Sequence, residues 1–149
     1  MIYFLLTIFF VLADILSKYI VTSKMSVGMS VPLWQNVFHL TYVRNTGAAF
    51  SMLSGQRLFL IVLPIVVIVA IIIYIFVKKP QNRWLLLSFS MIISGGIGNL
   101  IDRIRLGYVI DFLDFRLINF PVFNIADIWV TLGAAIFICT LLLSKEDTL

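Results

Sequence analysis

The sequence predicts an all-α membrane protein with four transmembrane helices, and two observations lead to that prediction. The 149 residues have a mean hydropathy of +1.11 and only 12% of them are charged, whereas a soluble domain carries about 25% charged residues. Four apolar segments are each about 20 residues long, enough for a helix rising about 1.5 Å per residue to cross the ~30 Å hydrocarbon core. We expect these helices at residues 2–22, 58–77, 84–102 and about 125–143, all within one membrane domain that spans 1–149.

The first two segments are both expected to be retained as spanning helices. Residues 2–22 lack the basic start and the small-residue cleavage site of a signal peptide, and Asp14 interrupts them. Residues 58–77 hold almost no polar side chain. Pro64 is expected to kink the second helix slightly.

The third and fourth segments each carry a stripe of small and polar residues at helical spacing. On the third segment the stripe comprises Ser94, Gly95, Gly98, Asn99 and Asp102, and on the fourth it comprises Asp127, Thr131, Ala134 and Ala135. Small residues allow close contact between helices, and polar residues turn away from lipid. Both stripes are therefore expected to face the interior of the bundle.

The loops suggest how the chain is oriented. The short turn "KKPQNR" (78–83) has three basic residues in six, which by the positive-inside rule places it in the cytoplasm. Both termini are then cytoplasmic, and the longer loops 23–57 and 103–123 are extracytoplasmic. Six other basic residues fall outside or at that interface, and we give the density in the short turn more weight.

The longer loops contain extended pieces. "VFHLTYV" (37–43) and "YVIDFLDF" (108–115) alternate well enough to predict two short strands. Paired, they would form a small sheet on the membrane surface. "NTGAAFSMLSG" (45–55) predicts a turn followed by a short interfacial helix.

Polar residues from three helices are expected to meet at one membrane face, whichever way the chain is oriented. The helix directions bring together Asp14 and Lys18 of the first, Asn99 and Asp102 of the third, and Asn124 and Asp127 of the fourth. Five of the seven acidic residues gather toward this face, and all five are aspartates. An aspartate at the centre of a membrane helix costs about 2.5–3.5 kcal/mol on insertion scales, so several of them indicate a functional site.

Structural roles for the same residues stay open. The alternatives are an ion pair of Asp14 with Lys18, a capping box formed by Asn124 and Asp127 at the start of the fourth helix, and an interfacial pair of Asp102 with Arg103 or Arg105. Gly95 and Gly98 are expected to serve helix packing. Each alternative explains one pair, whereas a site explains why the pairs share one face.

Several classes of function are disfavoured by composition. His39 is the single histidine and Cys139 the single cysteine, so a histidine metal site, a Ser-His relay or an intrachain disulfide is hard to build. The sequence has no run of basic residues with interleaved aromatics, so nucleic-acid binding is not predicted. A proton channel would need polar groups across the full depth of the membrane. The second segment and the inner halves of the others have almost none, which disfavours a channel. A hydrolase with a metal bound by aspartates and a purely structural subunit stay open.

Five motifs in order resemble those of lipoprotein signal peptidase, also called signal peptidase II. They are "DILSK" (14–18), "RNTGAAF" (44–50), "GNLIDR" (98–103), "VIDF" (109–112) and "FNIAD" (123–127). Each motif is weak alone, but together they cover essentially the whole chain. One departure is Ile15, where the family usually has Gln beside the first aspartate, which predicts the loss of a side-chain hydrogen bond there.

The resemblance implies a fold, an activity and a set of site residues. The fold would be four transmembrane helices with a small extracytoplasmic β-sheet and a short interfacial helix. The activity would be that of a bacterial aspartyl endopeptidase of the cytoplasmic membrane, which cuts diacylglyceryl-modified prolipoproteins just before the lipidated cysteine at the extracytoplasmic face. It implies no cofactor and no metal, and partners that include membrane lipids and globomycin-type inhibitors. The resemblance makes Asp111 and Asp127 the catalytic pair, and Asp14, Asn45, Asn99, Asp102, Arg103 and Asn124 the residues that shape the site and bind substrate.

Two close carboxylates suit peptide hydrolysis when they share one proton, because like charges side by side raise one of the two pKa values. In a strand Asp111 and Asp114 would point to opposite sides, so only one can face Asp127, and the motif selects Asp111. The start of the fourth helix favours an ionised Asp127. We therefore expect Asp111 to hold the proton. Arg44, Arg103 and Arg116 are candidates to contact carbonyls or lipid head groups.

Overall fold

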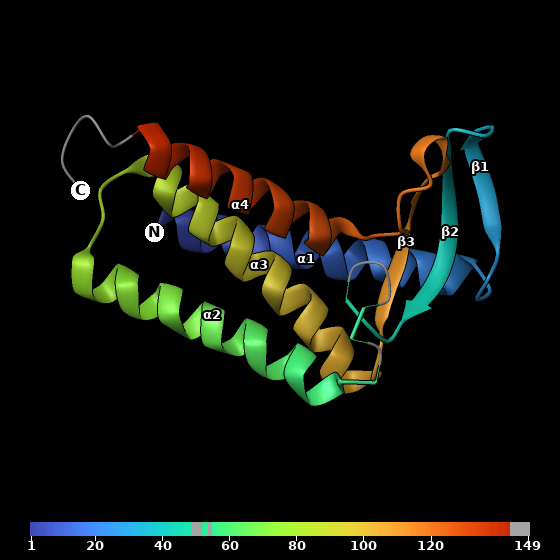
Figure 1. Ribbon diagram of the computed structural model, residues 1–149, viewed down its shortest axis with the longest axis horizontal. Coiled ribbons are helices and arrows are strands. Elements are labelled where there is room, and N and C mark those ends of the chain that lie inside the picture. Colours follow the sequence, from blue (N-terminus) through green and yellow to red (C-terminus); the bar gives the residue numbers. More distant parts are fainter. Residues whose placement is uncertain (49–51, 54, 144–149) are drawn as a thin grey trace.

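The computed structural model describes residues 1–48, 52, 53 and 55–143. Four long helices run side by side, and a small sheet lies across one end of them, here called the sheet end (Figure 1). The helices are α1 (Ile2–Lys24), α2 (Arg57–Lys78), α3 (Arg83–Arg105) and α4 (Ile125–Leu143). All four are long and apolar enough to cross a membrane. The predicted fold class is confirmed.

The ends of α3 are fixed by side chains. Asn82 is its N-cap, and the Asn82 side-chain oxygen accepts hydrogen bonds from the backbone N–H groups of Trp84 and Leu85. At the other end, the guanidinium of Arg57 donates to the carbonyl oxygens of Arg103 and Ile104. Because the last carbonyls of a helix lack partners within it, Arg57 both caps α3 and ties the start of α2 to it.

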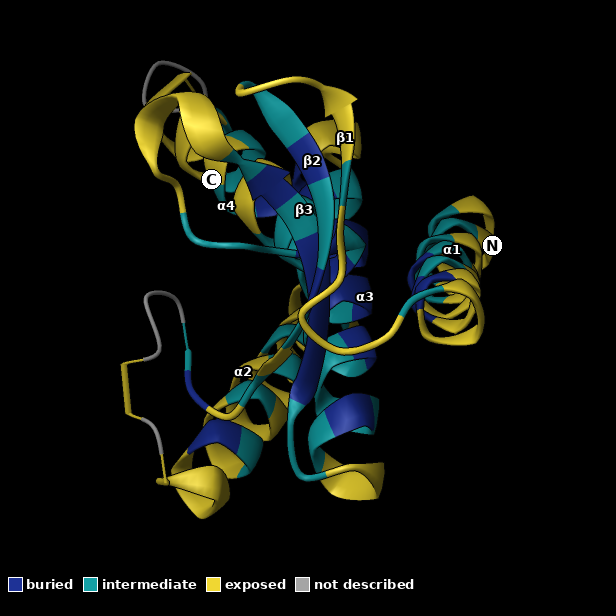
Figure 2. Cartoon of the chain, turned by 90° about the vertical axis from the view of Figure 1, so that its right-hand side faces the viewer, coloured by how far each residue is buried: buried dark blue, intermediate teal, exposed yellow. Residues whose placement is uncertain are grey.

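Helix α3 lies at the centre of the bundle. Viewed along the bundle from the sheet end, α1 stands on one side of α3, and α2 and α4 stand on the other (Figure 2). The buried side chains of α3 include Ser88, Ser90 and Ser94, whereas the outward faces of α1, α2 and α4 are mostly exposed and apolar. Polar side chains thus lie inside the bundle and apolar side chains face outward, as expected for helices surrounded by lipid.

Glycines let α3 and α4 approach closely. A Cβ on Gly95 would overlap the carbonyl oxygen of Ala126, and one on Gly133 would lie 2.9 Å from the carbonyl oxygen of Ser88. Gly95 belongs to the predicted packing stripe of α3, so that part of the stripe does face a neighbouring helix.

The sheet has three antiparallel strands in the order β1-β2-β3, which are Ser30–Trp34, Phe38–Asn45 and Val109–Phe115. The sequence predicts only two of them. Strand β1 contains Pro32 and is mostly exposed, so it lacks the alternation that marks a strand and carries a residue that only an edge strand tolerates. The expected interfacial helix within 45–55 falls on a segment whose residues 49–51 and 54 lie outside the described residues.

The connection from α3 to β3 is short. It comprises only residues 106–108, and Gly107 adopts a φ of +84°, a conformation that glycine accepts readily. Beyond it, Ile110 and Phe112 pack with Tyr42 of β2 and Val21 of α1 in one buried cluster. One face of the sheet is therefore anchored on the end of α1, and Asp111 is turned to the opposite face.

The close approach of α3 and α4 gives a matched test. Gly95→Ala should destabilise the protein by about 1–3 kcal/mol, the usual penalty for overpacking, because the added methyl group meets backbone. The neighbouring Gly96→Ala is the control, since its Cβ would meet only the flexible tip of Ile68 at 3.2 Å. Thermal unfolding in detergent measures both, and equal midpoints would contradict the packing role of Gly95.

Candidate active site

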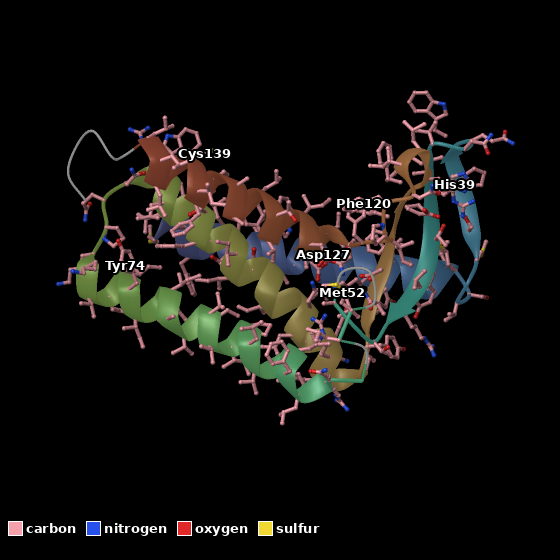
Figure 3. All side chains as sticks on the ribbon, viewed as in Figure 1. His39, Met52, Tyr74, Phe120, Asp127 and Cys139 are labelled. Atoms are coloured by element: carbon pink, nitrogen blue, oxygen red, sulfur yellow. The ribbon has the colours of Figure 1, made fainter. Side chains whose placement is uncertain are left out.

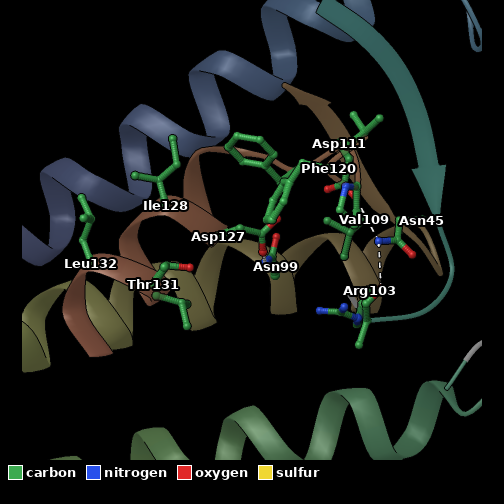
Figure 4. A pocket seen from close by; sticks show the side chains of 15 residues that line it. Asn45, Asn99, Arg103, Val109, Asp111, Phe120, Asp127, Ile128, Thr131 and Leu132 are labelled. Atoms are coloured by element: carbon green, nitrogen blue, oxygen red, sulfur yellow. Dashed lines mark hydrogen bonds between the residues drawn. The ribbon is translucent and has the colours of Figure 1, made fainter. Parts of the chain in front are cut away.

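A cavity of about 510 Å³ lies at the sheet end, between α3, α4 and β3. Asp111 and Asp127 both line it, together with Asn45, Asn99 and Arg103 (Figure 4). Figure 3 shows Asp127 at the end of α4 nearest the sheet, beside Phe120, whereas Cys139 lies toward the opposite end of that helix. The two aspartates, 16 positions apart in the chain by their numbers, thus face one space.

Asp127 sits in a capping box at the start of α4. The side-chain oxygen of Asn124 accepts from the backbone N–H of Asp127 at 3.0 Å, and Asp127 Oδ2 accepts from the backbone N–H of Asn124 at 3.1 Å. The capping interpretation is therefore confirmed, but it occupies only one carboxylate oxygen. The other, Oδ1, accepts from Asn99 Nδ2 at 2.8 Å.

Asp111 is held by two amides. Its Oδ1 accepts from Asn124 Nδ2 at 2.7 Å, and its Oδ2 accepts from Asn45 Nδ2 at 2.9 Å. The side chain is 2% exposed, and burial first, then the negative charge of Asp127, raise the pKa of Asp111 to about 7. Asn124 thus contacts both aspartates through one side chain, with its oxygen toward Asp127 and its nitrogen toward Asp111.

Lys18 fixes the orientation of Asn99. The Lys18 ammonium donates to Asn99 Oδ1 at 3.1 Å, and the Asn124 amide donates to the same oxygen at 3.0 Å. An ammonium has no acceptor, so the oxygen of Asn99 must face Lys18. Its NH2 group is thereby turned toward Asp127.

Lys18 also joins two buried aspartates. Its Nζ lies 2.8 Å from Asp14 Oδ2 and 3.0 Å from Asp102 Oδ2. The Asp14–Lys18 ion pair expected from the sequence is confirmed. The alternative pairing of Asp102 with Arg103 or Arg105 is wrong, because the ion pair that Asp102 makes among the described residues is with Lys18.

Two backbone N–H groups bind the carboxylates of this ion cluster. Asp14 Oδ1 accepts from the N–H of Ala126 in the first turn of α4, and Asp102 Oδ2 accepts from the N–H of Ile110 in β3. A Cβ on Gly98 would overlap Asp14 Oδ2, so glycine at that position admits the carboxylate. Ile15 is exposed. Asp14 Oδ1 accepts a hydrogen bond from Ala126, whereas the buried Oδ2 has the ion pair with Lys18 and no hydrogen bond among the described residues.

The loop after β2 supplies the remaining contacts. Asn45 Oδ1 accepts from the N–H of Gly47 at 2.9 Å, which leaves its nitrogen free to donate to Asp111. Arg103 Nη2 donates to the carbonyl oxygen of Gly47 at 2.9 Å. The arginine therefore ties the loop after β2 to α3 while it lines the cavity.

Asp114 belongs to a different cluster. Its Oδ2 accepts from Thr41 at 2.6 Å and from Arg116 at 2.8 Å. Partial burial raises the pKa of Asp114, but the hydrogen bonds from Thr41 and Arg116 outweigh it and bring that pKa below its usual value. Only one of the two strand aspartates faces Asp127, as the strand geometry predicts.

The structure thus gathers all eight residues that the sequence selects around one cavity and its buried ion cluster. The residue that the sequence analysis undervalued is Lys18, which it assigned only to Asp14. The signal for a wider role is that Lys18 is the one cation within the polar set of the first helix, where an unpaired ammonium is costly.

Comparisons with known proteins agree with this architecture. Residues 6–143 match the family model described as signal peptidase (SPase) II. The lipoprotein signal peptidase of Halothermothrix orenii is 48% identical over 135 residues, 91% of each chain, and that of Brevibacillus brevis is 40% identical over 144 residues, 97% of each chain. A bacterial membrane enzyme solved by the in meso method at 2.3 Å resolution superposes with a TM-score of 0.92 at 32% identity, covering 98% of this chain and 91% of the other.

Removing the buried cation tests the ion cluster. Lys18→Met should lower the free energy of unfolding by about 3–5 kcal/mol, because it leaves Asp14 and Asp102 buried without a counter-charge. Lys24→Met, an exposed position on the same helix, should change it by less than about 0.5 kcal/mol. Unfolding in detergent is the measurement, and a Lys18→Met protein as stable as the control would refute the role of the cluster.

Proposed function

The chain belongs to the signal peptidase II family, and on that premise we propose that it is an aspartic endopeptidase with Asp111 and Asp127 as its catalytic pair. The family consists of bacterial membrane peptidases that remove signal peptides from prolipoproteins. The substrate is therefore a prolipoprotein, and the reaction is hydrolysis of a peptide bond.

The observation that carries the proposal is that both carboxylates line one cavity and contact one asparagine. Peptide hydrolysis needs a water made nucleophilic and a proton for the departing amine. Two carboxylates that share a single proton supply both functions. Asn124 holds them in that relation, since it has no freedom to rotate without losing a contact to one of them.

The start of α4 favours Asp127 as the ionised partner. Each aspartate accepts from two N–H donors, but Asp127 alone lies in the first turn of a helix, where the helix dipole favours a carboxylate. The pKa of Asp111, raised to about 7, leaves a large fraction of that carboxyl protonated at neutral pH. Asp111 is accordingly the proton donor.

The steps follow from this assignment. Asp127 takes a proton from the attacking water as its oxygen bonds to the scissile carbonyl carbon, and Asp111 gives its proton to the carbonyl oxygen. When the carbon–nitrogen bond breaks, the proton on Asp127 passes to the departing nitrogen. The proton on the former carbonyl oxygen returns to Asp111, which restores the starting state.

The shape of the cavity suits a substrate held partly in the membrane. Beyond the dyad it continues along α4, where Val130, Thr131 and Leu132 line it. An apolar signal peptide can occupy this part while acyl chains on the cysteine stay in the bilayer, so that the cut falls just before the lipidated cysteine. The basic turn at 78–83 orients the cavity toward the extracytoplasmic face with both termini cytoplasmic.

The surroundings of Asp111 argue against a bridging metal ion. Both of its oxygens face amide NH2 groups, which donate hydrogen bonds and repel a cation. Between its terminal residues Arg57 and Lys78, helix α2 is almost entirely apolar, which argues against a polar path through the membrane. A cyclic peptide inhibitor of the globomycin type would occupy the same cavity and compete with prolipoprotein.

Substitution of the dyad is the central test. Asp111→Asn and Asp127→Asn should each lower cleavage of a diacylated prolipoprotein by about 10²- to 10⁴-fold, the usual worth of a general acid or base. The double variant should be hardly worse than either single one, because the pair acts as a unit. Cleavage is followed by gel shift of the processed protein.

Asp114→Asn is the matched control on the same strand. Asp114 does not line the dyad cavity, and its partly exposed ion pair with Arg116 is expected to contribute about 1 kcal/mol or less to stability, so cleavage should stay close to that of the wild type. Full activity of a folded Asp111→Asn protein would end the dyad proposal.

The raised pKa of Asp111 gives a prediction for pH dependence. Cleavage by the wild type should fall as the pH rises through about 7, because Asp111 then loses its proton. Asn45 stabilises the ionised form by donating to Asp111, so Asn45→Ala should raise that pKa and move the alkaline limb of the rate profile to higher pH. Asp114→Asn should leave the limb in place, and a limb that moves down in Asn45→Ala would contradict the assignment.

A further inference from the structure

Two adjoining cavities lie on the side of α3 that faces α1. The larger measures about 420 Å³ and the smaller about 180 Å³, and Thr22, Leu106 and Ile110 line both. Neither shares a lining residue with the cavity of the two aspartates. They form a second concave site at the sheet end.

Strand β3 separates this site from the dyad. Ile110 lines both new cavities, and Asp111, the next residue, lines the dyad cavity. Consecutive strand residues point to opposite faces. In Figure 2, α1 accordingly stands on one side of the sheet and α4 on the other.

The larger cavity is polar at its rim. Thr22 and Ser26 bring hydroxyl groups, and Arg44 lies with its guanidinium carbon 4.8 Å from the ring centroid of Tyr108. Arg44 is exposed. The cation–π contact with Tyr108 holds the guanidinium beside the ring, and because the side chain is exposed and has no carboxylate partner, its charge can bind an anion.

The smaller cavity joins a cation to apolar helix surfaces. Arg105, which lines it, is the last residue of α3, at the sheet end of a helix long enough to span the membrane. Ile15 and Tyr19 of α1 and Ile101 of α3 line the part nearer the middle of the bundle. A ligand here meets positive charge at one end and hydrocarbon at the other.

Two unpaired cations of the sheet end line this site. Lys18 is shared between Asp14 and Asp102, Arg116 pairs with Asp114, and the guanidinium groups of Arg57 and Arg103 bind backbone carbonyls. The ion pairs among the described residues leave Arg44, Arg105 and the exposed Lys24 without a carboxylate. Arg44 and Arg105 line the two cavities, whereas Lys24 does not. Asp102 lines the smaller cavity together with Lys18, its ion-pair partner.

We propose that the two cavities bind one anionic phospholipid, with its phosphate held by Arg44 and Arg105 and an acyl chain lying between α1 and α3. Basic pockets beside spanning helices recognise anionic head groups in this way. The apolar walls at Ile15, Tyr19 and Ile101 favour a lipid over a soluble phosphate, because they would stay unfilled by a head group alone. The site does not depend on the identity of the catalytic residues.

Native mass spectrometry of the full chain in neutral detergent tests the proposal. Phosphatidylglycerol should be retained at one copy and in preference to phosphatidylcholine. Arg44→Gln and Arg105→Gln should each weaken that retention about fivefold, the worth of one basic residue near an anionic lipid surface. Thr22→Trp should weaken it as well, since it fills the junction of the cavities without changing the charge.

The matched control removes two charges at the other end of the bundle. Lys78→Gln combined with Arg83→Gln, both exposed, should leave retention unchanged. Equal retention of the two lipids, equal losses in the control, or full competition by soluble glycerol phosphate would overturn the proposal. Unchanged unfolding midpoints in Arg44→Gln and Arg105→Gln show that the variants are folded.

Discussion

The relative positions of the membrane helices depend on the buried ammonium group of Lys18. It lies buried within 3.1 Å of three oxygen atoms, from Asp14 on its own helix and from Asn99 and Asp102 on α3. A charge in such surroundings is tolerable only if its partners stay in place, so the ion cluster fixes α1 against α3. Asp14 extends the constraint to α4 through the backbone of Ala126. Three helices are thereby aligned by one side chain.

The same constraint reaches the two aspartates through a sequence of directional hydrogen bonds. Lys18 can only donate, so it sets the orientation of the Asn99 amide, and the backbone N–H of Asp127 sets that of Asn124 in the same manner. Each amide then presents its NH2 group to a carboxylate. Rigid amides around the pair supply preorganised donors to both acids. The difference between Asp111 and Asp127 comes from the burial of Asp111 and from the helix start at Asp127.

The sequence predicts the features of this protein that depend on local pattern. Helix length, hydropathy and the spacing of Asn124 and Asp127 are local, and the structure confirms the four-helix fold and the capping box. The partner of Asp102 is not local, because Lys18 is 84 positions away by residue number, and neighbouring arginines offered a nearer choice. Strand β1 was missed because Pro32 and its exposure conceal the pattern. Amide orientations depend on which donors arrive from other helices, and no periodicity encodes that.

The three-residue link between α3 and β3 makes chain length itself a constraint. Residues 106–108 pass directly from a helix tied to the ion cluster into the strand that carries Asp111. Because neighbouring positions in a strand alternate between faces, inserting or deleting one residue there would turn every side chain of β3 to the other face. The carboxylate of Asp111 would turn toward α1, and either Ile110 (after an insertion) or Phe112 (after a deletion) would face Asp127. The number of residues in this link is therefore more tightly constrained than their chemistry.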